Sequence, residues 1–99
     1  MIDKNQLSLE QALVPVRRQI DELDTQLLDW LVKRIELIKC VGKIKKEYSA
    51  PALSQSREDE VLARVENEAM KRGIPTLLIR DIWKAIFKTA YIVEENHDK

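Results

Sequence analysis

A long amphipathic segment dominates the first half of the sequence. Between Val16 and Ser49, apolar residues recur every three or four positions, the spacing that places side chains on one face of an α-helix. The segment contains no proline, and its only glycine is Gly42. The pattern therefore predicts one long helix over about residues 15–47. Its apolar line consists of Ile20, Leu23, Leu27, Leu31, Ile35, Ile38 and Val41.

Two shorter amphipathic segments follow, each bounded by turn residues. Pro51 disfavours helix, and Ser56 is a favourable N-cap residue, so a second helix is predicted over about residues 57–72. Gly73 suits the left-handed position that ends such a helix. After a short connection, a third helix is predicted over about residues 76–95. The chain is thus expected to form a single all-α domain of three helices.

The first helix is longer than so short a chain can cover. A helix over residues 16–49 rises about 50 Å, whereas a compact domain of this size has a radius of gyration of about 13 Å. The other two helices cannot bury its whole apolar face. We therefore expect the chain to dimerise or trimerise, most simply through a second copy of the same helix.

Composition and charge narrow the functional classes. The formal net charge is zero, which argues against a nucleic-acid or anionic-membrane binder. No apolar run approaches the roughly 20 residues of a membrane span, and a lone cysteine, Cys40, excludes an internal disulfide, so a cytoplasmic location is expected. Motifs for a metal, a dinucleotide or a phosphate loop are absent, so no cofactor is expected. The chain is either a mature protein or one domain of a longer enzyme.

Three basic residues of the long helix are the candidate binding groups. Arg34 and Lys45 lie about three turns apart on one face, about 16 Å along the axis, so their long side chains could hold opposite ends of one small molecule. Arg17 lies about 25 Å from Arg34 and about 100° round the helix, which is beyond the reach of the same pocket. It could instead serve the pocket of a partner chain. Ordinary solvated helix charges are the alternative interpretation.

Four motifs give the sequence a likeness to a known family. They are R-x-x-I-D-x-L-D at residues 17–24, L-x-x-R at 31–34, V-G-K-x-K at 41–45 and R-E at 57–58. With this spacing the chain resembles the all-helical chorismate mutases of the AroQ class. The resemblance implies an intertwined homodimer with two sites, each completed by one residue of the other chain. It also implies the cofactor-free rearrangement of chorismate to prephenate, a step of aromatic amino-acid biosynthesis.

The resemblance implies a role for each matching residue. Arg17 of the partner chain and Arg34 would bind the two carboxylates of the substrate. Lys45 would contact a carboxylate and the ether oxygen. Arg57 would support the carboxylate site, and Glu58 would bind the ring hydroxyl.

Three positions depart from the usual family pattern. Glu94 stands where a glutamine commonly donates to the ether oxygen, and a carboxyl group has to be protonated to donate. This predicts an activity that is best at mildly acidic pH, and a Glu94→Gln variant that works over a broader range. Ser54 replaces a frequent aspartate near the ring hydroxyl, so that contact would be weaker or come from the backbone, and Ala90 replaces a frequent serine.

Two alternatives remain open from the sequence. Isochorismate pyruvate lyases, which form salicylate, share the fold and the positions of Arg17, Arg34 and Lys45. The Arg57–Glu58 pair favours the mutase. A non-catalytic or regulatory helical dimer would keep the fold without the site, but the retained spacing of the basic residues argues against it.

Overall fold

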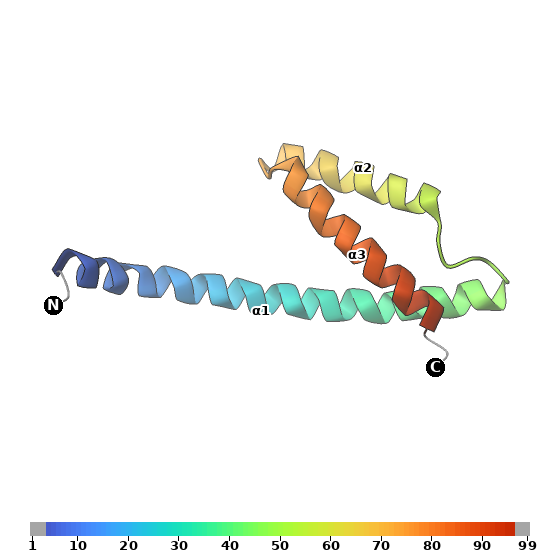
Figure 1. The fold of residues 1–99 in the computed structure, drawn as a ribbon, viewed down its shortest axis with the longest axis horizontal. Helices are drawn as coiled ribbons and strands as arrows, with labels where there is room; N and C mark the ends of the chain where they lie inside the picture. The colour runs from blue at the N-terminus through green and yellow to red at the C-terminus, as the bar shows by residue number, and fades with distance from the viewer. Residues whose placement is uncertain (1–3, 97–99) are drawn as a thin grey trace. The chain divides into compact units, whose positions relative to one another are not determined.

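A computed structural model describes residues 4–96 of the chain. For residues 4–7 and 96 only the helical backbone is described. Over these residues the chain forms α1 (Lys4–Glu47), α2 (Gln55–Lys71) and α3 (Thr76–Asn96), joined by short loops (Figure 1). The described part contains no strand. The predicted all-α fold is therefore confirmed.

The chain divides into two compact units, Met1–Arg34 and Ile35–Lys99. The described part of the first unit is helix throughout, because α1 begins at Lys4, well before the predicted start near residue 15. Pro15 suits a first helical turn, but here it lies inside the helix. The residues before it are mostly good helix formers, so the helix continues despite the one hydrogen bond that proline removes.

The second unit holds the end of α1, all of α2 and all of α3. α2 begins at Gln55 and has Ser54 as its N-cap, so the prediction of Ser56 was wrong. The Ser54 backbone is extended, its hydroxyl accepts from the Arg57 N–H at 3.4 Å, and its carbonyl accepts from the Glu58 N–H at 3.1 Å. Serine is a favourable N-cap residue at either position, so only the register of the first turn decides between Ser54 and Ser56.

The end of α2 agrees with the sequence. Gly73 has φ of 72°, the left-handed conformation expected there. The Ile74 N–H donates to the Ala69 carbonyl at 2.8 Å, and the Gly73 N–H donates to the Met70 carbonyl at 3.3 Å. These two bonds form a Schellman motif, which satisfies the last carbonyls of the helix and reverses the chain into α3.

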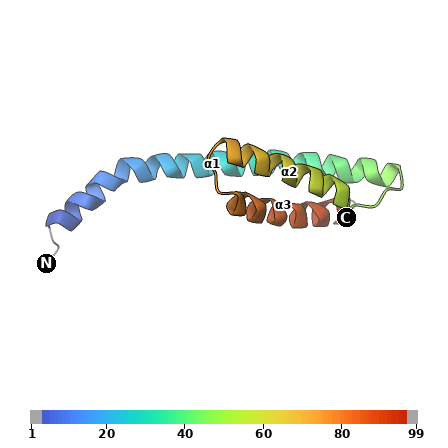
Figure 2. The same cartoon turned by 90° about the horizontal axis from the view of Figure 1, so that it is seen from above.

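The core of the second unit lies between α2 and α3, which run side by side (Figure 2). Val61 and Ala69 are 4% and 2% exposed, and Val65 and Ile79 are also buried. Burying an aliphatic side chain of this kind stabilises a fold by about 1.5–3 kcal/mol, so this small core supplies only modest stability. Larger side chains surround it in partly buried positions: Leu62, Ile74, Trp83 and Phe87.

An ion pair also joins α2 to α3. The Arg80 Nε donates to the Glu66 Oε1 at 2.7 Å. This hydrogen bond, followed by the Arg80 and Lys84 charges, holds the pKa of Glu66 below its ordinary value. The same hydrogen bond raises the pKa of Arg80. The pair therefore favours the side-by-side arrangement of the two helices.

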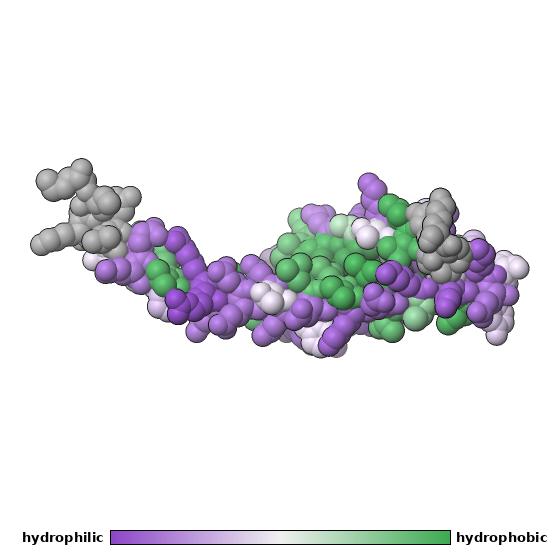
Figure 3. Space-filling model, turned by 90° about the horizontal axis from the view of Figure 1, so that it is seen from below, coloured by the Kyte–Doolittle hydropathy of each residue, from purple (hydrophilic) through white to green (hydrophobic). Residues whose placement is uncertain are grey.

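The apolar face of α1 remains largely in contact with solvent. Leu27 and Trp30 are 60% and 64% exposed in the single chain. α3 also leaves apolar side chains uncovered, including Leu77 and Leu78, and Figure 3 shows a broad apolar patch on the surface. Patches of this extent mark surfaces that bind another molecule. The other exposed apolar residues of α1 include Val16, Ile20, Leu23, Leu28, Leu31, Val32, Ile35, Leu37, Val41 and Ile44.

Candidate functional site

Lys45, near the end of α1, and Glu94 of α3 form an ion pair. The Lys45 Nζ lies 2.6 Å from the Glu94 Oε1, and the two side chains are 25% and 9% exposed. Lys45 belongs to the last turn of α1, where a cation interacts favourably with the helix dipole. Two candidate residues from distant parts of the sequence are therefore in direct contact.

The ammonium group of Lys45 has a second acceptor. Its Nζ donates to the backbone carbonyl of Ala52 at 2.6 Å, in the loop between α1 and α2. Sequence reasoning did not find this contact, because a backbone carbonyl has no residue signature. The only signal was the short distance along the chain between Lys45 and the loop.

The Glu94 carboxyl group is well shielded from water. Its Oε1 atom, which faces Lys45, has almost no accessible surface. A partner of opposite charge offsets the cost of removing a carboxylate from water. One turn earlier on α3, a hydrogen bond to the Glu95 carboxylate raises the pKa of Tyr91. The end of α3 thus carries two acidic side chains with different partners.

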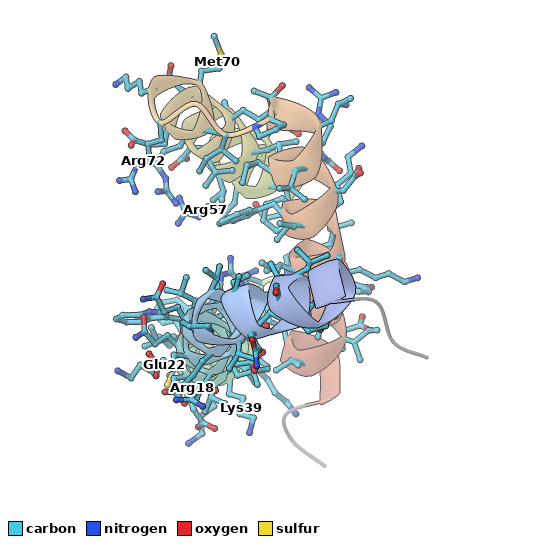
Figure 4. All side chains as sticks on the ribbon, turned by 90° about the vertical axis from the view of Figure 1, so that its left-hand side faces the viewer. Arg18, Glu22, Lys39, Arg57, Met70 and Arg72 are labelled. Atoms are coloured by element: carbon cyan, nitrogen blue, oxygen red, sulfur yellow. The ribbon has the colours of Figure 1, made fainter. Side chains whose placement is uncertain are left out.

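Arg57 and Glu58, adjacent residues in the first turn of α2, have different surroundings. Arg57 is exposed, and its Nη1 lies 2.7 Å from the Glu60 Oε1 on the same helix. In Figure 4 Arg57 and Arg72 extend from α2 toward the same side. Glu58 is half-buried and lines a cleft of about 470 Å³ between α2 and α3, together with Gln55, Asp59, Leu62, Lys84, Phe87 and Lys88.

Ser54 has a structural task in the free chain. Its hydroxyl caps α2, and it also lies 3.4 Å from the Ser56 hydroxyl. An aspartate at this position would cap the helix equally well.

Arg17 and Arg34 belong to the first unit, so their positions are described within that unit alone. The Arg17 Nη1 lies 2.8 Å from the Glu10 Oε2, and its side chain is 57% exposed. Arg34 is half-buried. The structure therefore brings Lys45 and Glu94 together, whereas Arg17 and Arg34 are each described only within the first unit.

Two negative findings concern the described residues only. Within residues 4–96, no group of histidine, cysteine or acidic side chains has the arrangement of a metal site. Over the same range, none of the helices combines the length and the apolar character needed to cross a membrane.

The fold and these charged groups define a class of all-α chains that carry cationic side chains along one long helix. The chain belongs to the chorismate mutase type II family, which it matches over residues 16–95. The resemblance seen in the sequence is thereby confirmed.

Individual relatives are similar over most of this chain. The T-protein of Enterobacter agglomerans is 38% identical over 84 residues, which cover 85% of this chain and 22% of the relative. The T-protein of Haemophilus influenzae is 35% identical over 88 residues, covering 89% of this chain and 23% of the relative. The chain thus spans less than a quarter of the length of these relatives. No solved structure matches it.

Proposed function

We propose that the chain catalyses the rearrangement of chorismate to prephenate in aromatic amino-acid biosynthesis. Membership of the chorismate mutase type II family over residues 16–95 supports this activity. The observation that carries the proposal is the 2.6 Å contact between Lys45 and Glu94. These are the two residues that the family resemblance directs to the ether oxygen of the substrate, and they come from different helices.

The reaction needs positioning and electrostatic stabilisation. One carbon–oxygen bond breaks and one carbon–carbon bond forms within the same molecule, so no covalent intermediate is required. The protein has to hold the dianion in a compact conformation and stabilise the negative charge that grows on the ether oxygen. The Lys45 ammonium is a suitable donor, and Glu94 becomes a second donor when it carries a proton.

The carboxylates of chorismate call for cationic partners. A guanidinium group binds a carboxylate through two parallel hydrogen bonds. In this proposal Arg34 and the Arg17 of a partner chain bind the two carboxylates. Arg57 supports their site, while Glu58 and the region of Ser54 lie near the ring hydroxyl.

We also propose that the active protein is a homodimer. The exposed apolar faces of α1 and α3 support a second copy as the covering partner, because so much apolar surface is unfavourable in water. The antiparallel or crossed pairing of two α1 helices would bring Arg17 of one chain to the site of the other. A cytoplasmic location belongs to the same proposal, since the exposed Cys40 is a free thiol.

The test is turnover of purified protein with chorismate and, separately, with isochorismate. We expect loss of chorismate with prephenate as the product, and loss of activity in Arg34→Ala with an unchanged oligomeric state. Salicylate formed from isochorismate, without prephenate from chorismate, would replace the proposal by the lyase reaction. Binding of neither substrate by a well-folded dimer would indicate a non-catalytic role.

A further inference from the structure

The turn after α1 contacts both the backbone carbonyl and the side-chain ammonium of Lys45. The Ala50 N–H donates to the Lys45 backbone carbonyl at 2.7 Å, and the Ser49 N–H donates to the Lys46 carbonyl at 3.1 Å. The Lys45 ammonium in turn donates to the Ala52 carbonyl at 2.6 Å. Residues 49–52 therefore fix both the backbone and the tip of this side chain.

The same motif ends α2, with one difference that is informative. At the end of α2 the left-handed residue is Gly73, which adopts its φ of 72° without a side-chain clash. At the end of α1 the corresponding residue is Ser49, with φ of 53°. A residue with a Cβ reaches this conformation only at a cost, which the surrounding contacts have to offset. The contacts that do so here are those with Lys45 and Lys46.

A lysine ammonium has three N–H donors and a flexible stem. In Lys45 one donor is directed to the Ala52 carbonyl, and the ammonium also lies 2.6 Å from the Glu94 Oε1 as an ion pair. The hydrogen bond to the loop and the ion pair with α3 restrict the rotamer of the side chain and the position of the ammonium group. The ammonium group is thus oriented before a ligand arrives, which lowers the entropic cost of positioning it.

We propose that the Ser49–Ala52 turn is a positioning device for Lys45, with the Ala52 carbonyl as the group that orients its ammonium toward the substrate. This inference rests on the proposed function of Lys45 as a substrate-binding residue. Ser49 and Ala52 touch no substrate in this account and act only through Lys45. Weakening the Ala52 carbonyl should therefore lower kcat more than it raises KM.

The direct test replaces the peptide bond between Ala52 and Leu53 by an ester in the full-length chain. An ester carbonyl is a weaker acceptor, and the side chains stay unchanged. The matched control is an ester between Pro51 and Ala52, which weakens the neighbouring Pro51 carbonyl. We expect the first ester to lower kcat about three- to tenfold with KM changed less than about twofold, and the control to stay within about twofold of the parent in both.

Proton exchange of the Lys45 ammonium, followed by ¹⁵N NMR without substrate, gives a readout that needs no turnover. We expect faster exchange in the Ala52–Leu53 ester than in the control. If exchange accelerates but kcat is unchanged, the turn holds Lys45 without serving catalysis and the inference fails. Equal exchange in both esters also overturns it. Absence of chorismate turnover in the unmodified protein would instead contradict the proposed function.

A second test uses the left-handed residue itself. Ser49→Gly keeps the turn and should retain kcat within about twofold, whereas Ser49→Val cannot adopt this φ comfortably and should lower kcat about tenfold. Both variants are compared at matched helix content and oligomeric state. Equal kcat values in folded Gly and Val variants would show that the conformation of residue 49 does not position Lys45.

Discussion

The two units of the chain use the same kind of sequence with different results. Both have apolar residues at helical spacing. In the unit Ile35–Lys99 some of these residues form a small core between α2 and α3, whereas in the described part of the unit Met1–Arg34 most of them remain exposed. The contrast teaches that periodicity predicts a helix and its apolar face, but burial requires a second element to pack against that face.

Candidate residues occur in both units. Lys45 and Glu94 form an ion pair within the unit Ile35–Lys99, which contains the core. Arg17 forms an exposed ion pair with Glu10 on its own helix. Exposed ion pairs of this kind contribute little to the free energy of unfolding, about 0–1 kcal/mol. Arg17 is therefore available to exchange Glu10 for a carboxylate of a ligand.

The largest predicted effect concerns the Lys45–Glu94 ion pair, called the preformed pair below. Lys45→Ala removes the charge that faces the developing negative charge, so kcat/KM for chorismate should fall by about 10²–10³-fold. Lys43→Ala, an exposed lysine of the same helix, is the control and should stay within about twofold. Steady-state kinetics measure both. Full activity in Lys45→Ala would remove this residue from the site.

The exposed face of α1 gives the next largest effect. Leu27→Asp places a charge on that face, and if a second copy covers it, stability of the dimer should fall by about 2 kcal/mol or more. Gln26→Asp adds the same charge one position away and should have little effect. Sedimentation and denaturant unfolding compare the two variants. Indistinguishable behaviour would mean that the face of Leu27 stays in water.

The predicted pH dependence separates the two donors of the preformed pair. Because Glu94 donates only when protonated, kcat should be higher at mildly acidic pH than at neutral pH, whereas Glu94→Gln should give a much flatter profile. Glu95→Gln, the adjacent exposed residue, should keep the profile of the parent. A flat profile for the parent protein would contradict the role of Glu94 as a protonated donor.

The smallest effect concerns the ion pair between α2 and α3. The Arg80 hydrogen bond lowers the pKa of Glu66, so the pair stabilises the fold at neutral pH and this contribution is lost as the pH falls through the lowered pKa. Glu66→Gln should unfold slightly more easily than the parent at about pH 7, with the difference vanishing once the pH has fallen below the lowered pKa of Glu66. Glu60→Gln, whose partner Arg57 lies on the same helix, is the control. A difference that persists in acid would exclude this ion pair as its cause.

The sequence predicted the type and order of the helices, the end of α1 at Glu47 and the turn at Gly73, because periodicity and glycine act locally. It misplaced the start of α1, since a single proline costs less than the helix around it gains. It also chose Ser56 over Ser54, because two similar caps differ only in the register of the turn.

The sequence located the candidate site in part. Lys45 was named from its helical spacing to Arg34 and Glu94 from the family resemblance, whereas their contact depends on where the fold places α3 relative to the end of α1. The Ala52 carbonyl and the Glu66–Arg80 pair were missed. Backbone groups carry no residue signature, and the partner of a charge on one helix depends on how a second helix lies against it.

The central claim is that α1 contributes to two sites. Arg34 and Lys45 would belong to the site of their own chain, and Arg17 would reach the site of a partner chain. A mixed dimer tests it most directly. Arg17→Ala and Arg34→Ala chains, each nearly inactive alone, are unfolded together, refolded as a mixture and assayed with chorismate. Random pairing makes about half of the dimers mixed, each with one intact site of two, so about a quarter of the parental activity should return. Arg18→Ala, the neighbouring arginine, should retain activity by itself. No recovery in a mixture that demonstrably contains mixed dimers would contradict the shared site.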